Sequence, residues 1–375
     1  MNNPRNDTAL MLSGGGARAA YQVGVLKAIT QFLPRNHNIP FPIICGTSAG
    51  AINATAMACY ASCYHLGVRK LEHVWKHMLP EHIFETRFGS VLRHLIKNYL
   101  KIFRSDDIEH FPSSILNNEP LRRLLHKTLD FPRLERNLAQ GHLRAVCVNA
   151  SSYANHDSLT FFQSGEDIEP WQRVKRRGLA CRLNVEHLMA SAAIPMLFPS
   201  IKLGNEYFGD GSIHQLSPLS APIHLGANKV MVIGMEQPIL PLISHPKAPS
   251  LSAVAGHLLD TVFEDTLSAD LERLERINHL ITLMDAKKRS QSHLRPIQTL
   301  VLNPTIDLNH LASENYHLLP AGLRSMLNIL GIRADAESSL PSYLLFDHRY
   351  CSALIQYGFN DTMQREDEIR QFLEL

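Results

Sequence analysis

Residues 41–51 read Phe-Pro-Ile-Ile-Cys-Gly-Thr-Ser-Ala-Gly-Ala, a short apolar run that enters a Gly-x-Ser-x-Gly turn and leaves through small residues. This pattern predicts a buried strand, a sharp turn and a helix. The glycines at 46 and 50 remove the Cβ atoms that would clash in so tight a bend, and the turn pushes the Ser48 hydroxyl out of the backbone. The helix that follows aims its N-terminal N–H groups at Ser48, where they stabilise negative charge. Gly46, Ser48 and Gly50 are therefore predicted to form a nucleophile elbow.

A second glycine-rich turn precedes the elbow. A strand is predicted over 8–12, a loop of Ser-Gly-Gly-Gly-Ala-Arg over 13–18, and a helix over 19–33, before the chain re-enters the sheet at 41–45. This is one βαβ unit, whose right-handed crossover places its two strands parallel and close together. We therefore expect the glycine loop and Ser48 to lie at the same edge of the sheet.

The composition narrows the classes of partner and cofactor. The 375 residues include 37 lysines and arginines against 35 acids, so the net charge predicts no nucleic-acid partner. No acid occurs from Thr8 through Leu71, which leaves the region around Ser48 electropositive. Six scattered cysteines without a Cys-x-x-Cys pair indicate reduced core thiols in a cytosolic setting. The twenty histidines form no zinc-binding motif, so we expect neither a metal nor another cofactor.

Lipid contact, where it occurs, is expected to be peripheral. The sequence contains no run of about eighteen consecutive apolar residues, the length needed to span a bilayer. The N-terminus lacks the pattern of a secretory signal. We therefore expect a cytoplasmic protein, with the inner membrane face as its site of peripheral contact. We interpret the helical, basic stretch over 67–104 as an amphipathic helix with a solvated basic face. We interpret the basic cluster at Arg173–Arg177 as a solvated loop. Contact with anionic lipid is the alternative for both.

The rest of the chain alternates strand and helix patterns without internal repeats. Further strands are predicted over 143–149, 158–163, 229–235 and 297–302. Helices are predicted over 185–193 and 251–288, with Leu258, Val262, Leu271, Leu274, Leu280 and Met284 of the second facing inward. A proline-rich loop is expected over 237–249 and helical stretches over 313–375, and no linker is long enough to make that tail an independent domain.

Acyl transfer needs a nucleophile, a base and donors for the oxyanion. The consecutive glycines at 14, 15 and 16 leave backbone N–H groups unshielded and suit an oxyanion hole. The spacing Gly14-x-Gly16-x-x-Ala19 also matches a dinucleotide-binding loop, which requires an acid about twenty residues further on to hold the ribose. The acid-free span lacks that partner, so nucleotide binding is disfavoured.

The position of the elbow argues against the usual hydrolase order, because only one βα unit precedes Ser48. Three motifs instead occur in order over about the first 235 residues: 14–18 (Gly-Gly-Gly-Ala-Arg), 46–50 (Gly-Thr-Ser-Ala-Gly), and Asp210-Gly211-Ser212, preceded by Ala190–Pro195 and Phe198-Pro199. With these motifs the sequence resembles the patatin-like phospholipase family, in its bacterial form. The resemblance implies an α/β, three-layer fold with a mostly parallel central sheet flanked by helices and a helical C-terminal extension.

The resemblance also implies roles for residues. Ser48 would be the nucleophile and Asp210 the base of a Ser–Asp dyad, with Gly211 and Ser212 completing the proton-acceptor motif. Gly14, Gly15 and Gly16 would form the oxyanion loop, which Arg18 would fix. Ala19 stands where the family often has a glycine. Ser212 stands where the family usually has a glycine or an alanine. The expected domains are an acyl hydrolase domain over 1–312, with a helical cap over 67–140, and a helical extension over 313–375 packed on it.

The function expected from these residues is that of a serine lipid acyl hydrolase, of phospholipase A or esterase type, which acts through an acyl-enzyme. A short-chain carboxylesterase or thioesterase and a non-catalytic acyl-lipid-binding regulator are the alternatives. An ordinary aspartate has a pKa of about 3.9 and is a poor base for serine, so desolvation must raise the pKa of Asp210. His214, four residues past Asp210, is interpreted as a loop histidine; the third member of a conventional triad is the alternative.

Overall fold

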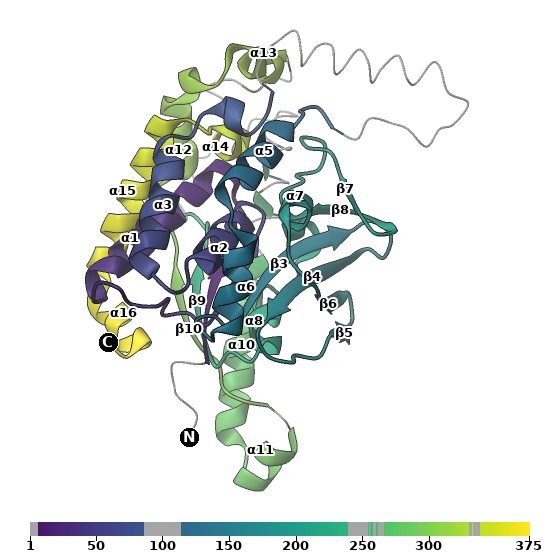
Figure 1. The fold of residues 1–375 in the computed structure, drawn as a ribbon, viewed down its shortest axis with the longest axis vertical. Helices are drawn as coiled ribbons and strands as arrows, with labels where there is room; N and C mark the ends of the chain where they lie inside the picture. The colour runs from purple at the N-terminus through teal and green to yellow at the C-terminus, as the bar shows by residue number, and fades with distance from the viewer. Residues whose placement is uncertain are drawn as a thin grey trace, which may run out of the picture.

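The computed structural model describes residues 7–85, 114–238, 254, 256–257, 260–261, 266–292, 294–329, 332 and 338–375. Ten strands form one sheet at its centre (Figure 1). The strand order is β10-β9-β1-β2-β3-β4-β6-β5, with β8 pairing both β3 and β7. The predictions that fall on residues 86–113 and 239–249, including the basic side chains at 93, 97, 101 and 104 and most of the proline-rich loop, lie outside the described residues.

The central strands are parallel, as the sequence predicted. β1 (Thr8–Leu12) lies between β2 (Ile43–Thr47) and β9 (Lys229–Ile233), and β10 (Gln298–Leu302) follows β9, all in parallel. β3 (Ala145–Ser152) is parallel to β2 and antiparallel to β4 (Asp157–Ser164). Beyond β4 come β6 (Arg176–Ala180) and β5 (Trp171–Arg173). The sheet is therefore mixed but mostly parallel.

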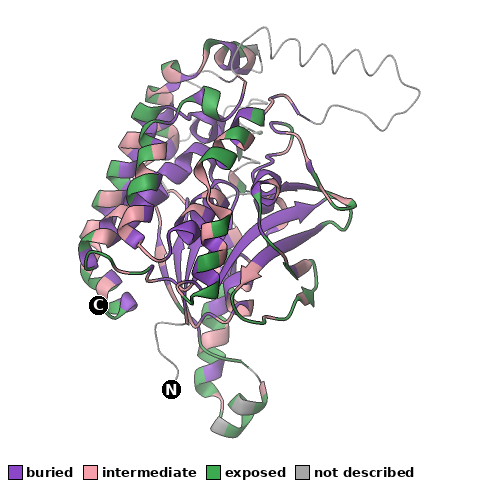
Figure 2. Ribbon diagram, viewed as in Figure 1, coloured by how far each residue is buried: buried purple, intermediate pink, exposed green. Residues whose placement is uncertain are grey.

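Helices cover both faces of this sheet, because successive side chains of a buried strand point to opposite faces. Leu10 and Ile44 face a large core formed with α1 (Ala20–Phe32), α2 (Ala49–Cys59), α3 (Tyr64–Lys76), α5 (Glu119–Thr128), α6 (Phe131–Ala139) and α7 (Val185–Ser191). Ala9 and Ile43 face a smaller core under α8 (Ser220–His224) and α10 (Thr266–Leu283). Figure 2 shows the central strands buried and the outer helix faces exposed. The predicted three-layer α/β fold is confirmed.

The C-terminal helices belong to the same core. They are α12 (Leu308–Glu314), α13 (Ala321–Ile329), α14 (Leu340–Leu344), α15 (His348–Gln364) and α16 (Glu366–Leu373). α15 runs beside α1 (Figure 1), and the Tyr21 hydroxyl donates a hydrogen bond of 3.0 Å to Asp361 Oδ2 across this contact. Leu344 and Leu354 lie in one apolar cluster with Val25 of α1. The last part of the chain is thus packed into the layer that covers Ser48.

Two local predictions were wrong. The basic cluster at 173–177 is not a loop: most of it forms the β5–β6 hairpin, because Trp171 stacks between Phe162 and His224, with ring centroids 5.0 and 4.9 Å apart. The helix predicted over 251–288 is not continuous: α10 (Thr266–Leu283) ends before Met284 and Asp285, and a separate α11 (Ala286–Ser292) follows.

The inward face of that helix agrees with the prediction only in part: Leu274 is buried and Leu271 packs partly buried against the same core, as predicted, but Leu280 is not inward. Leu267, Leu274 and Ile281 are buried at a spacing of seven residues, which keeps them on one side of the helix. Leu280 lies about 100° away from Ile281 on a helix of 3.6 residues per turn and is 56% exposed rather than inward.

Candidate active site

The elbow holds Ser48 in a strained backbone conformation. Its φ of 55° and ψ of −129° are rare for a residue with a side chain, and such strain is typical of functional sites. A Cβ on Gly46 would lie 2.4 Å from the Gly50 carbonyl oxygen, and one on Gly50 would lie 2.4 Å from that of Leu12. Only glycine fits at either position, so the strand-to-helix turn depends on both.

A second serine supports the elbow. The Ser48 backbone N–H donates to Ser191 Oγ at 2.8 Å, and the Ser191 hydroxyl donates to the Asn149 carbonyl oxygen at 2.6 Å. Ser191 therefore ties the elbow to both α7 and β3. Ser191 belongs to the motif at 190–195, but its sequence pattern predicts no role for this serine; its position between two alanines was the available signal.

The sheet brings Asp210 to the elbow. β2 pairs with β3 as far as the Thr47–Asn149 pair, and β8 (Glu206–Asp210) pairs with β3 from Ala150, which lies opposite Asp210. β4 occupies the other edge of β3 along its whole length, so β2 and β8 share one edge end to end. Asp210 therefore lies next to the end of β2, where the elbow begins. β7 (Ile201–Leu203) pairs with β8 and supports this strand.

Burial makes Asp210 a stronger base than an ordinary aspartate. Its side chain is fully buried, and desolvation raises its pKa from 3.8 to about 6, against the lowering effect of donors from Ser48 and Ser212. Oδ1 accepts the Ser212 N–H at 3.0 Å. Among the described residues no donor makes a well-formed hydrogen bond to the buried Oδ2, although the Ser48 hydroxyl is near enough to lower the pKa. One carboxylate oxygen is therefore fixed and the other is available to take a proton.

The motif residues around Asp210 are tightly packed. A Cβ on Gly211 would lie 2.2 Å from the Asn149 carbonyl oxygen, so the chain can turn against β3 only with glycine there. Ser212 begins the turn that follows, and its N–H is the donor to Asp210. The structure thus brings Gly211 and Ser212 together with Ser48 and Asp210.

The glycine loop lies between β1 and the 3₁₀ turn at Gly16–Ala19. Gly16 has a φ of +55° and lines the same cavity as Ser48, which Gly14 and Gly15 do not. Within the described parts of the chain, no acceptor receives the backbone N–H of Gly14, Gly15 or Gly16. These N–H groups are therefore available to a ligand, and Gly16 is the one of the three glycines that lines the cavity.

Arg18 does not face the cavity. Its guanidinium is fully buried and donates to Ser342 Oγ (2.8 Å), the Tyr343 hydroxyl (3.0 Å) and Asn309 Oδ1 (2.8 Å). The Cζ atom lies 3.8 Å from the centre of the Tyr343 ring. Asp260 supplies a carboxylate at 3.3 Å. A Cβ on Gly16 would lie 2.3 Å from the Tyr343 carbonyl oxygen. The loop is therefore held against α14.

Sequence reasoning missed these C-terminal partners, because no local pattern marks a residue that binds an arginine more than 300 positions away. The buried Arg18 was itself the available signal: a buried guanidinium requires several acceptors, and the polar residues of an otherwise apolar segment at 340–346 could supply them.

Among the described contacts, none joins the His214 side chain to Ser48 or Asp210. Its N–H donates to Ser151 Oγ, and its ring faces that of His156 with centroids 6.4 Å apart. Burial and the neighbouring cations lower its pKa. Its neighbours, Ser151 on β3 and His156 just before β4, thus favour a structural role for His214 over that of a third triad member.

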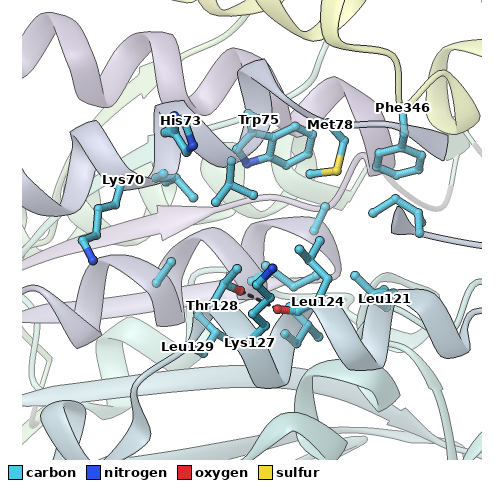
Figure 3. Close-up of a pocket in the computed structure, with 18 of the residues that line it drawn as sticks. Lys70, His73, Trp75, Met78, Leu121, Leu124, Lys127, Thr128, Leu129 and Phe346 are labelled. Atoms are coloured by element: carbon cyan, nitrogen blue, oxygen red, sulfur yellow. Dashed lines mark hydrogen bonds between the residues drawn. The ribbon is translucent and has the colours of Figure 1, made fainter. Parts of the chain in front are cut away.

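An apolar cavity of about 560 Å³ opens from Ser48. Its floor is one face of α2, formed by Ala49, Ile52, Ala56 and Tyr60, and its walls come from α3 and α5 (Figure 3). The aromatic and aliphatic lining includes Trp75, Met78, Phe198 and Phe346. The lining also includes the cations Arg69, Lys70 and Lys127, of which Lys70 lies against the Tyr60 ring. The cavity has the size and apolar lining of a ligand site.

The described residues contain no group of three or more His, Cys, Asp or Glu side chains that could hold a metal ion. All six cysteines are free, and those at 45, 59, 147 and 351 are buried in the core. Within the same residues, no helix combines the length and the apolar character needed to cross a bilayer.

Comparison with known proteins connects this geometry to a family. The model of the family described as patatin-like phospholipase matches residues 10–223, which is more than half of the chain and includes every candidate residue from Gly14 to Ser212. No curated protein matches the sequence.

Two solved structures are similar to the fold. VipD from Legionella pneumophila has 13% sequence identity and a TM-score of 0.38, over 97% of this chain and 67% of the VipD chain. The structure of full-length SpcU with full-length ExoU, from the type III secretion system of Pseudomonas aeruginosa, matches with 14% identity and a TM-score of 0.28, over 97% of this chain and 80% of the matched chain. Both scores are low, so assignment to a family rests on the family model.

The contacts of Arg18 predict that removal of one hydroxyl will loosen the glycine loop. In Tyr343→Phe the ring stays over the guanidinium, but a donor of the buried cation loses its acceptor, so we expect a loss of stability on the order of 2 kcal/mol in urea unfolding. Tyr350→Phe is the matched control, because Tyr350 is fully buried nearby and its hydroxyl has no partner among the described residues. Equal stability of the two variants would contradict this role of Tyr343.

Proposed function

Because the chain belongs to the patatin-like phospholipase family, we propose that it is a serine lipid acyl hydrolase, which cleaves a carboxylic ester through an acyl-enzyme formed on Ser48. The observation that carries the proposal is the fully buried Asp210, with a raised pKa and a free carboxylate oxygen, beside a strained serine at the end of an apolar cavity. Perturbed titratable groups in such cavities are typical of catalytic sites.

In the proposed reaction Ser48 Oγ attacks the ester carbonyl carbon while Asp210 Oδ2 takes the hydroxyl proton. The carbonyl π electrons move to oxygen, and the N–H groups of the glycine loop, with the N-terminus of α2, stabilise that oxyanion. Collapse of the intermediate breaks the ester C–O bond, and the proton on Asp210 passes to the departing alcohol. A water molecule then attacks the acyl-enzyme, gives its proton to Asp210 and releases the carboxylic acid, after which the proton returns to Ser48.

The length and apolar lining of the cavity support the proposal that the part of the substrate held beside Ser48 is a long acyl chain. Its floor follows α2 from Ala49 to Tyr60, a distance of about 17 Å at 1.5 Å per residue. One leaflet of a bilayer has a hydrocarbon depth of about 15 Å, half of the ~30 Å core. An acyl chain from a membrane lipid therefore matches the floor in both length and polarity.

Two alternatives make different demands on this cavity. A short-chain esterase or thioesterase would leave most of the α2 floor unused. A non-catalytic acyl-lipid-binding regulator would need the cavity but neither the nucleophile nor its base. The long floor argues against the first, and the free carboxylate oxygen beside Ser48 argues against the second.

Removal of either dyad member tests the proposal. Ser48→Ala and Asp210→Asn should lower hydrolysis of an octanoyl nitrophenyl ester on the order of a thousandfold or more, and Ser48→Ala should abolish labelling by a fluorophosphonate probe. His214→Ala is the control and should keep activity and labelling. Wild-type protein that neither reacts with the probe nor hydrolyses the ester would favour the regulator.

Asp210→Asn should also stabilise the fold. The pKa of Asp210 is raised in the folded state, so above about pH 6 the buried carboxylate ion destabilises the native protein, on the order of 3 kcal/mol for a rise from 3.8 to about 6. The variant should therefore gain stability at neutral pH and lose that gain below about pH 4, where both states are protonated. Urea unfolding at the two pH values measures the difference, and an unstable Asp210→Asn at neutral pH would contradict the burial cost.

The pH profile should follow the same carboxylate. Because the base must be ionised, kcat/KM for a soluble ester should be level above about pH 6 and fall about tenfold per pH unit below it. The inflection should be unchanged in His214→Ala. Loss of the inflection from the pH profile of His214→Ala would assign the titration to His214 instead.

Ala56 should set the length of acyl chain that fits. It lies on the cavity floor seven residues beyond Ala49, about 10 Å along the helix. Ala56→Phe should fill the far half of the floor and lower kcat/KM for a palmitoyl ester at least tenfold relative to a butyryl ester. Ala139→Phe, on the exposed side of α6, makes the same change outside the cavity and should leave the ratio unaltered. An unchanged ratio in Ala56→Phe would place the acyl chain elsewhere.

A further inference from the structure

The two helices that wall the cavity carry cations on their outer faces. On α3 the exposed side chains Arg69, Lys70, His73, Lys76 and His77 fall within about 120° of one another at 100° per residue. On α5 the same holds for Arg123, His126 and Lys127, with Arg122 half-buried beside them. Part of each basic face borders the cavity, because Arg69, Lys70 and His73 of α3 and Lys127 of α5 are among its lining residues.

The carboxylates of these two helices are already paired. Glu72 on α3 accepts Lys27 at 2.9 Å and Lys76 at 2.7 Å, and these partners lower its pKa against the effect of its burial. Glu119 on α5 pairs with Arg122 at 3.0 Å, and Arg122 also contacts Glu186.

Four cations on the rim lack such a partner. Within the described part of the chain no carboxylate pairs with Arg69, Lys70, Arg123 or Lys127, which we call the rim cations. The whole chain is almost neutral, with 37 basic against 35 acidic residues, so this is a local concentration of charge.

The rim cations and the cavity form one surface. Arg69, Lys70 and Lys127 line the opening themselves, and Figure 3 shows Lys70 and Lys127 on the two facing helices. Lys70 Nζ lies 5.1 Å from the centre of the Tyr60 ring, and Arg133 lies 4.4 Å from it. Tyr60, at the end of the floor, thus joins the apolar groove to the charged rim, which is the arrangement of aromatic anchors at membrane interfaces.

From this arrangement we propose that the α3–α5 rim is a docking surface for an anionic phospholipid bilayer. Cations spaced around an apolar groove match a surface of phosphate groups with hydrocarbon beneath, since the lysine and arginine stems can lie on apolar surface while their charged ends meet phosphate. An acidic protein would satisfy the cations but would leave the apolar groove between them without a matching group. The bilayer satisfies both at once.

Vesicle binding by the full chain carrying Ser48→Ala tests the proposal without dependence on hydrolysis, so its failure is separate from failure of the proposed function. The protein should sediment with vesicles of equal parts phosphatidylcholine and phosphatidylglycerol and much less with phosphatidylcholine alone, and added salt should weaken this binding. Lys70→Gln/Lys127→Gln should reduce the partition about 25-fold, since each cation near an anionic surface contributes about fivefold, or ~1 kcal/mol.

The β5–β6 hairpin provides the matched control. Arg173→Gln/Lys175→Gln also removes two exposed cations, but from a part of the sheet away from α3 and α5 (Figure 1), and should bind as the parent does. Equal binding by the rim variant and its parent, or an equal loss in the hairpin variant, would overturn the proposal. Absence of binding to both vesicle types would also overturn it and would favour an acidic protein as the partner of the rim.

Discussion

The carboxylate of Asp210, held in the core without contact with water, is the constraint on which the rest of the site depends. A carboxylate that keeps its hydration would be too weak a base to assist a serine hydroxyl, and burial is the main cause of its raised pKa. That burial destabilises the ionised carboxylate and lowers the free energy of unfolding. Other interactions in the fold must offset this loss, because the buried charge itself adds no favourable packing. The large apolar core on this face of the sheet provides the stability that such a charge requires.

The geometry that places this charge is a property of the sheet. β2 and β8 occupy successive parts of one edge of β3, so the last residue of β8 meets the turn that follows β2. A shift of one residue in the β3–β8 register would turn Asp210 to the opposite face of the sheet. Gly211, which fits against the Asn149 carbonyl oxygen without a Cβ, and the bond from the Asp210 N–H to the Ala193 carbonyl oxygen restrict this register.

The sequence predicted most of the layers and the elbow because each depends on local pattern. The alternation of short apolar runs with helices identified the parallel strands, and the glycines around Ser48 identified the turn. The pairing of β8 with β3 could not be predicted in this way, because a strand of five residues that begins with Glu206 and Tyr207 has little apolar alternation. Likewise, the hairpin at 171–180 depends on the stacking of Trp171 between rings from β4 and α8, which no charge pattern indicates.

The partners of Arg18 extend the site beyond the part of the chain that resembles the family. The family match ends at residue 223, yet the buried guanidinium donates to Asn309, Ser342 and Tyr343, and Phe346 lines the same cavity as Ser48. A buried arginine without its acceptors would cost several kcal/mol, so the glycine loop cannot keep this conformation without α14. The helices α12 and α14 therefore support the candidate active site. The part of the chain that must fold to hold the glycine loop is longer than the part that carries the three motifs.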